Sequence, residues 1–315
     1  MRLGVYFGWH VHGFEELLAL VELAEELGYD AAFVDGDATL HPGRETLDAW
    51  TVTTALIART RRIGIGSLRI VHHWTAARLA QAVASAERIA PGRLRFLVSI
   101  GDRPIDARFG LPVLPVGERI RRLDETLDAV RALWRGETVT RAGRYVQLAG
   151  ASLCPAPPAG RVEIAVAAKG PRLLEVVARH ADVWEVNLPP VPARVAAASA
   201  ALEAACARIG RDPGRIERSM LVFTRIAGSP DPAPFLAEFR RLNPWFAFVA
   251  DGEALAALVV GRPEHCLRRI ASISRELAIA RPTLDLSGLP AGEARRVLSA
   301  LSPRNNRVDT HSSAP

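Results

Sequence analysis

VEIAVAAKGPRLLEVVARHADVWEVN, residues 162–187, holds a complete strand–helix–strand pattern. An apolar run over residues 162–167 is followed by helical spacing of apolar residues over 172–180. A second apolar run covers residues 183–187. Two strands joined by one helix lie parallel, with a right-handed crossover. The stretch therefore predicts one unit of an α/β fold.

The same alternation continues toward both ends of the chain. Strands are expected at residues 3–7, 31–34, 63–68, 94–100, 162–167, 183–187, 219–227 and 282–286. Each of these runs is followed by a segment with helical periodicity. Eight parallel strands joined by helices are the number that closes into a barrel. The sequence therefore predicts a (β/α)8 TIM barrel, with a doubly wound open sheet as the alternative.

Two segments interrupt this alternation. Residues 136–158, after the fourth strand, are rich in Gly and Pro and contain short polar and apolar runs. A mixed region around Asn243 to Trp245 follows the seventh strand. Both are expected to be excursions from one barrel domain over residues 1–301, and the polar tail 302–315 is expected to be disordered.

Composition excludes several classes of function. The net charge is +6, but the basic residues are spread along helices that also carry Asp and Glu, so no nucleic-acid partner is expected. The N-terminus enters a strand directly, and no uncharged run reaches eighteen residues, so we expect a cytoplasmic protein with no membrane partner. The scattered cysteines Cys154, Cys206 and Cys266 fit a reducing compartment.

Polar and aromatic side chains gather where the predicted strands end. In a barrel of this kind the active site lies at the carboxyl ends of the strands. A histidine titrates near neutral pH, so His10 and His41 are candidate catalytic residues there, although a single histidine is more often structural. Candidates for the pocket of a small-molecule substrate are Trp9, His72, His73, Trp74 and Asn187. No metal site is expected, because neighbouring side chains diverge and His72 and His73 have no third ligand at a recognisable spacing.

Several short motifs resemble one known family. The motifs are FGLP at 109–112, ERIRRLDE at 118–125, ALWRG at 132–136, GRY at 143–145, AAKGPR at 167–172, RHADVW at 179–184 and VGRPE at 260–264. Together they are similar to the luciferase-like monooxygenase superfamily of flavin and deazaflavin oxidoreductases, over about residues 1 to 300. The resemblance implies the same barrel fold and an oxidoreductase activity.

The turn after the strand at 162–167 suits a bound phosphate. Small residues let a ligand approach the backbone, Pro171 fits the first turn of the following helix, and that turn offers free N–H groups to an anion. The alternative is that the turn is only a tight connection. Resemblance to the deazaflavin-dependent branch implies that coenzyme F-420 binds here, with FMN as the alternative cofactor. The residues concerned are Ala167, Ala168, Lys169, Gly170 and Pro171, and Lys169 could add positive charge.

The third strand is the second point of resemblance. Family members often carry a non-prolyl cis peptide bond there, behind the ring system, which in this chain would fall near Gly66 and Ser67, followed by Leu68. These three residues and Gly101 are therefore assigned to the cofactor. The alternative for Gly64 and Gly66 is that both merely relieve crowding in a barrel strand.

The resemblance also implies residues that handle a proton. Asp102 stands where some deazaflavin dehydrogenases carry a carboxylate, and a carboxyl group beside an apolar ring suits acid–base work. A turn-forming Asp is the alternative at that position. Where the branch often has an Asp-His pair, this chain has Gly36 and Asp37, so the chemistry either uses Asp37 or borrows one of the histidines.

The sequence therefore predicts reversible hydride transfer between coenzyme F-420 and a small organic substrate. One alternative is an FMN-dependent monooxygenase that uses reduced flavin and O2. Another is a non-catalytic relative that binds the cofactor without turnover. Members of the family are commonly dimers or larger, so the resemblance also implies a homodimer, although the sequence carries no interface signature.

Overall fold

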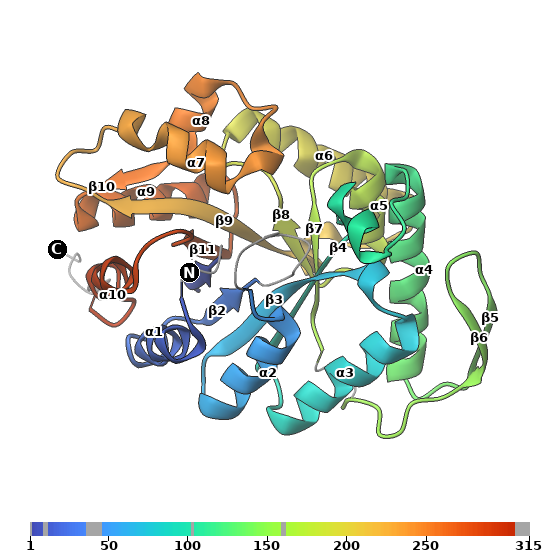
Figure 1. Cartoon of the computed structure of the whole chain (residues 1–315). Helices are drawn as coiled ribbons and strands as arrows, with labels where there is room; N and C mark the ends of the chain where they lie inside the picture. The colour runs from blue at the N-terminus through green and yellow to red at the C-terminus, as the bar shows by residue number, and fades with distance from the viewer. Residues whose placement is uncertain (1, 9–11, 36–45, 102–103, 159–161, 306–315) are drawn as a thin grey trace, which may run out of the picture.

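Eight parallel strands close into a ring in the computed structural model of the chain, which describes residues 2–8, 12–35, 46–101, 104–158 and 162–305 (Figure 1). Around the ring the order is β1, β2, β3, β4, β7, β8, β9 and β11, and β11 returns to β1. Their bounds are Gly4–Phe7, Ala31–Val34, Gly64–Ile70, Leu94–Ser99, Ile164–Ala168, Val183–Val186, Glu217–Ile226 and Arg281–Asp285. The predicted (β/α)8 barrel is confirmed, and the open sheet is excluded because β8 pairs with β9.

One long helix lies between successive strands and covers the outside of the ring (Figure 1). These helices are α1 Phe14–Glu26, α2 Ala49–Arg59, α3 Ala76–Ile89, α4 Val116–Trp134, α5 Pro171–His180, α6 Pro192–Arg208, α9 Pro263–Glu276 and, after β11, α10 Ala291–Ala300. Helix α3 begins after Thr75, because the Thr75 side chain accepts the N–H of Arg78 at 3.4 Å and caps the helix.

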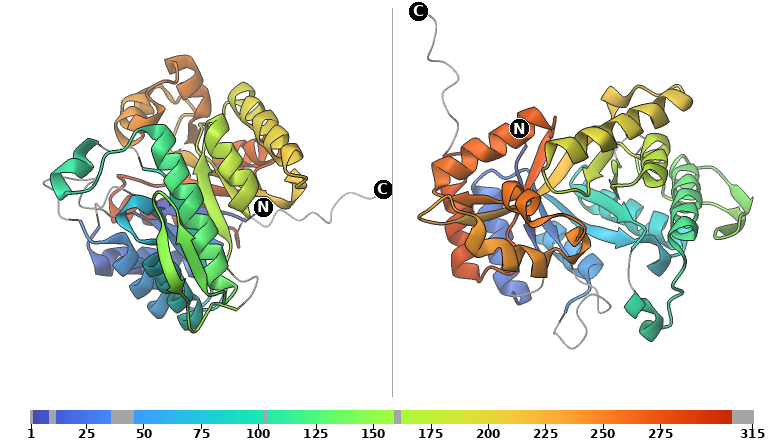
Figure 2. Two further views of the ribbon diagram at one scale, coloured as in Figure 1. Left: turned by 90° about the vertical axis from the view of Figure 1, so that its right-hand side faces the viewer. Right: turned by 90° about the horizontal axis from the view of Figure 1, so that it is seen from above.

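Both predicted excursions are present. Between α4 and β7, strands β5 Val139–Ala142 and β6 Gln147–Ala151 form an antiparallel hairpin that lies outside the ring beside α4 (Figure 2). Between β9 and α9 the chain forms α7 Leu236–Leu242, α8 Asp251–Ala257 and β10 Val259–Gly261. The short 3-10 turns are η1 Val71–His73, η2 Pro104–Phe109, η3 Pro213–Arg215, η4 Ala233–Phe235 and η5 Pro244–Phe246.

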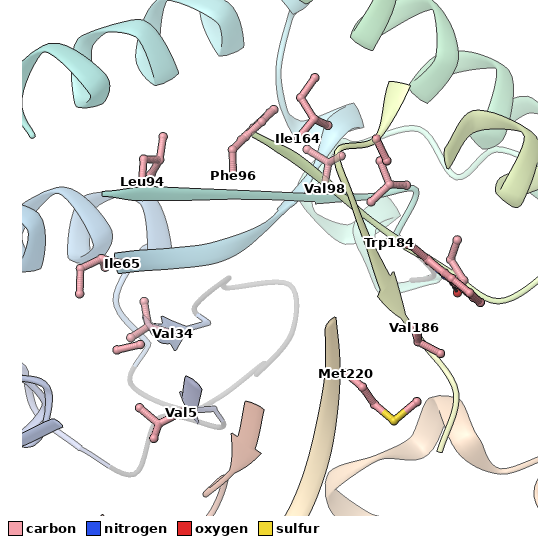
Figure 3. Close-up of a cluster of buried hydrophobic side chains, with 14 of the residues drawn as sticks. Val5, Val34, Ile65, Leu94, Phe96, Val98, Ile164, Trp184, Val186 and Met220 are labelled. Carbon is pink, nitrogen blue, oxygen red and sulfur yellow. Dashed lines mark hydrogen bonds between the residues drawn. The ribbon is translucent and has the colours of Figure 1, made fainter. Parts of the chain in front are cut away.

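The main hydrophobic core lies between the ring of strands and the helices. Alternate residues of the strands point outward into this layer, and each is almost fully buried (Figure 3). They include Val5, Val34, Ile65, Phe96, Val98, Ile164, Trp184, Val186 and Met220. A smaller core holds the second excursion together and is made of Phe223, Phe239, Leu242, Phe246, Val249, Ala254, Leu258 and Val260.

Glycines in β3 make room for its neighbour β4. A Cβ atom at Gly66 would lie 2.6 Å from the carbonyl oxygen of Arg95 and 2.7 Å from its Cβ. Strand β3 pairs regularly from Gly64 to Ile70, and among the described residues the only cis peptide bond is Cys154–Pro155. The non-prolyl cis bond expected near Gly66 and Ser67 is therefore wrong, and relief of crowding explains Gly66.

The start of the predicted tail is also corrected. Ser302 is fully buried, and its hydroxyl donates to the carbonyl oxygen of Leu27 at 3.1 Å. The backbone N–H of Arg304 donates to the same carbonyl oxygen. Residues 302–305 thus pack against the end of α1, while 306–315 lie outside the described residues. Within the described ranges, no helix combines the length and apolar character that crossing a membrane requires.

Candidate functional site at the carboxyl ends of the strands

The mouth of the barrel is lined by the last inward-pointing residues of the strands. Residues paired in register between parallel strands point to the same side of the sheet. Tyr6 is paired with Phe33 on one side and with Asp285 on the other, and all three face the interior. The Tyr6 hydroxyl donates a hydrogen bond of 2.6 Å to Oδ2 of Asp35, the residue that follows β2. Polar groups therefore meet at the ends of β1, β2 and β11.

Strand β3 offers an apolar surface to the same mouth. Leu68 is paired with Leu97, which lines the barrel interior, and its side chain remains 37% exposed. Ser67 points the other way, since its Oγ lies 2.7 Å from Oγ1 of Thr53 on α2. Of the three β3 residues assigned to the cofactor, only Leu68 therefore presents a side chain to the barrel interior, while the space beside Gly66 is filled by Arg95 and Phe33.

The predicted pocket residues after β3 form a packed corner. His72 is buried, and a Cβ atom at Gly101 would lie 3.0 Å from its Cε1 and 2.7 Å from Cγ2 of Ile70. Gly101 also has a φ of +67°, so glycine is favoured there by both backbone and space. Arg119 of α4 donates to the carbonyl oxygen of Gly101, which ties the end of β4 to that helix.

The aromatic rings of this corner contact one another. The ring centroids of His72 and His73 lie 4.5 Å apart, edge to face. The expectation that these two side chains diverge is therefore wrong. Trp74 packs edge to face against Trp50 of α2, with ring centroids 5.9 Å apart. In the part of the chain that the structure describes, no cluster of metal-binding side chains occurs. The side chains of this corner therefore pack against one another and form one wall of the mouth.

The turn between β7 and α5 has room for a ligand. The carbonyl oxygen of Ala168 accepts hydrogen bonds from the backbone N–H of Asn187 and from Nε1 of Trp184, which anchors the turn. Gly170 caps α5 and Pro171 occupies its first position, as predicted. A Cβ atom at Gly170 would meet nothing within 4 Å, and its φ of −113° suits any residue. Neither packing nor backbone geometry therefore requires glycine here, and the space in front of the turn is open.

Lys169 connects this turn to the second excursion. Its Nζ donates to the carbonyl oxygen of Trp245 at 3.2 Å and lies 4.9 Å from the ring centroid of Phe248. Arg194 of α6 lies 5.4 Å from the same ring and forms an ion pair of 2.6 Å with Glu253 of α8. The ammonium group expected near a phosphate thus also holds the excursion against the end of β7.

Five of the predicted site residues lie outside the described residues. They are Trp9, His10, Asp37, His41 and Asp102. Their strands are nevertheless β1, β2 and β4, whose described ends form the mouth.

Comparison with known proteins identifies the family. The model of the family described as luciferase-like monooxygenase matches residues 1–281. The chain belongs to this family. Relatives in it include an F-420-dependent glucose-6-phosphate dehydrogenase of Microbacterium testaceum, 31% identical over 186 residues, which are 58% of this chain and 55% of that protein. The chain thus matches only about half the length of that curated relative.

Two further proteins are similar to this chain. A phthiodiolone/phenolphthiodiolone dimycocerosates ketoreductase of Mycobacterium tuberculosis is 36% identical over 140 residues, covering 42% of this chain and 35% of that one. The structure of an F-420-dependent secondary alcohol dehydrogenase with an F-420–acetone adduct superposes with a TM-score of 0.79 over 95% of this chain and 98% of that chain. At 18% identity, this likeness shows the shared fold alone.

Two carboxyl groups inside this family barrel were missed by sequence reasoning. They are Asp285 at the end of β11 and Glu185 in β8. Burial raises the pKa of Asp285 despite hydrogen bonds from Ser287. Burial also raises the pKa of Glu185 to about 7. The available signal was an acidic residue inside otherwise apolar runs, VWEV and PTLD, at the inward-pointing position.

The described residues also line a cavity of about 30 Å³ deeper in the barrel, below the mouth. Its wall includes Phe33, Leu97, Ala165, Glu185 and Thr283. Because the chemistry of this fold takes place at the carboxyl ends of the strands, we place the candidate site at the mouth rather than in this cavity.

Proposed function

We propose that the chain is a coenzyme F-420-dependent oxidoreductase that transfers a hydride to or from a small organic substrate. The observation that carries the proposal is the similarity, at 31–33% identity, to several F-420-dependent glucose-6-phosphate dehydrogenases. The open turn at Gly170, at the mouth of a barrel of the same family, supports it. The deazaflavin would supply the hydride chemistry, and the protein would bind, orient and manage protons.

The residues present fit such a cofactor. A ring can lie along the apolar end of β3, where the side chain of Leu68 is partly exposed. The first turn of α5 leaves N–H groups free for a phosphate, and the open space at Gly170 gives access to them. In this proposal the cofactor contacts Gly66, Ser67, Leu68, Gly101, Ala167, Ala168, Lys169, Gly170 and Pro171, with Ser67 contributing backbone atoms.

The proposed chemistry also needs groups at the reacting centre. Candidate catalytic residues remain Asp37, Asp102, His41 and His10, and candidate substrate contacts remain Trp9, His72, His73, Trp74 and Asn187. A homodimer in the cytoplasm is part of the same proposal.

A second candidate is an FMN-dependent monooxygenase that uses reduced flavin and O2. The description of the matching family, luciferase-like monooxygenase, favours this alternative. The same mouth and the same turn would serve, because FMN also carries a phosphate.

Cofactor binding tests the two candidates directly. The pure protein is titrated separately with oxidised and reduced F-420 and with oxidised and reduced FMN, and binding is followed by absorbance. Tight binding of F-420, with substrate turnover that needs no O2, is the expected result. Binding of FMN alone, with turnover that requires O2, would replace the first candidate by the second.

A further inference from the structure

The hydrogen bond between Tyr6 and Asp35 joins two neighbouring strands at the mouth. Tyr6 is the last but one residue of β1, and Asp35 directly follows β2. The two oxygens lie 2.6 Å apart, and Asp35 is only 9% exposed. Tyr6 is partly exposed and faces the barrel interior at the mouth, where the proposed substrate would bind.

Gly8 leaves the space that the Tyr6 ring occupies. A Cβ atom at Gly8 would lie 2.4 Å from Cε1 of Tyr6 and 2.5 Å from its hydroxyl oxygen. No real Cβ atom makes contacts this short, so only glycine at position 8 leaves the ring its place. Parallel pairing of Tyr6 with Phe33 holds the backbone in register, which brings the ring beside Asp35 two residues later.

The direction of the hydrogen bond defines the roles of the two groups. Tyr6 is the donor and Oδ2 of Asp35 is the acceptor. A phenol that donates one hydrogen still has lone pairs with which to accept another. Tyr6 can thus take a proton from a substrate hydroxyl while its own proton moves to Asp35.

We propose that Tyr6 and Asp35 are the proton-transfer pair for the substrate oxygen, a proposal that rests on the proposed function. In the oxidising direction the substrate C–H bond would break and its electron pair would leave as hydride, for which a bound oxidised deazaflavin would be the acceptor. The substrate O–H proton passes to Tyr6, the Tyr6 proton passes to Oδ2 of Asp35, and the carbonyl double bond forms. The reducing direction runs through the same transfers in reverse.

Other ionisable groups lie near this pair. Asp285 of β11 is in register with Tyr6 on its other side, but its Oδ1 accepts the backbone N–H of Ser287 at 2.9 Å, and burial raises its pKa. Glu185 lies deeper, on the wall of the internal cavity. Asp35, hydrogen-bonded directly to the phenol, is therefore the base that we assign.

A purely structural hydrogen bond would behave differently. If the pair only held β1 against β2, its loss would lower the melting temperature and weaken cofactor binding, with no specific loss in the rate of hydride transfer. A proton-transfer pair instead affects the rate, and its two members act as a unit whose losses do not add.

The experiment compares Tyr6→Phe, Asp35→Asn and the double variant with the wild type, and Tyr145→Phe is the control. Tyr145 is a half-buried tyrosine on the hairpin outside the barrel. For each protein the F-420 dissociation constant, the single-turnover rate of hydride transfer at saturating substrate and the melting temperature are measured. A proton NMR spectrum without cofactor monitors the strongly downfield resonance expected of a short O–H···O hydrogen bond.

We expect each single variant to lose about 10²-fold in rate, within the range for general acid–base catalysis. The F-420 dissociation constant should stay within a factor of three. The double variant should be no slower than the slower single variant, and the downfield resonance should be lost in Tyr6→Phe and Asp35→Asn but kept in Tyr145→Phe. If Tyr6→Phe does not fold, Asp35→Asn, which keeps the shape of the side chain, carries the test.

The outcomes separate the two proposals. A wild type that binds F-420, with variants that keep its rate, overturns the proton-transfer pair and leaves the proposed function standing. A wild type that binds no F-420 overturns the proposed function and the pair that rests on it.

Discussion

The hydroxyl of Ser219 on β9 donates a hydrogen bond of 2.5 Å to the carboxyl group of Glu185 on β8, inside the barrel. Glu185 and Ser219 are also the last pair at which the backbones of these two strands are in register. The side chains therefore add a connection between β8 and β9 at the point where the backbone pairing ends, and the carboxyl group also accepts the N–H of Leu221.

The buried carboxyl group of Glu185 predicts a pH dependence of stability. Burial raises its pKa from 4.5 to about 7, so the folded protein binds the proton more tightly than the unfolded chain. The stabilisation that this proton gives the folded protein is complete below pH 4.5 and is lost as the pH rises through 7. Over that range we expect the free energy of unfolding of the wild type to fall by about 3 kcal/mol through this group. Glu185→Gln should not show this fall. Urea unfolding at several pH values measures it, and an unchanged slope in the variant would contradict the assignment.

Because the turn before α5 is open, a side chain added at Gly170 should weaken cofactor binding without destabilising the fold. Gly170→Val should weaken cofactor binding at least tenfold, because the new side chain fills the space in front of the turn, while the melting temperature should change little. Gly292→Val on α10 is the matched control, because a Cβ atom there also meets nothing within 4 Å and Gly292 is not one of the proposed cofactor contacts. Isothermal titration and thermal unfolding provide the two measurements. An unchanged dissociation constant in Gly170→Val would remove the turn from the cofactor site.

The contacts of Lys169 predict local dynamics. Lys169→Met removes the ammonium group from the Phe248 ring and from the Trp245 carbonyl oxygen. An exposed cation–π contact contributes about 0.5–1 kcal/mol, so amide hydrogen exchange over residues 244–250 should become about two- to fivefold faster. Exchange in the hairpin β5–β6 is the internal reference. Equal exchange in both proteins would mean that Lys169 does not hold the excursion.

Asp102 predicts a loss of catalysis without a loss of binding. If its carboxyl group transfers a proton at the reacting centre, Asp102→Asn should lower turnover about 10²-fold or more while the cofactor dissociation constant changes little. Steady-state rates and cofactor titration of the same preparation test this. Equal losses in rate and affinity would speak for a turn-forming aspartate instead.

Residues 162–187 show how closely local patterns predict the fold. Strand β7, helix α5 and strand β8 lie within two residues of their expected bounds, and Pro171 opens the helix as expected. Periodicity and capping act over a few residues, so they can be read directly from the chain. The mouth was predicted less well, because Ser67 was assigned to the cofactor although its side chain points to Thr53.

The sequence by itself determined the order of strands and helices, the two excursions and the barrel class, because these depend on short-range patterns repeated along the chain. Only the tertiary structure decided that Gly66 is needed beside Arg95, that Lys169 lies against Phe248 and that Tyr6 donates to Asp35. Each of these contacts joins residues far apart in the chain. Their distances depend on how strands and helices pack, which no local pattern specifies.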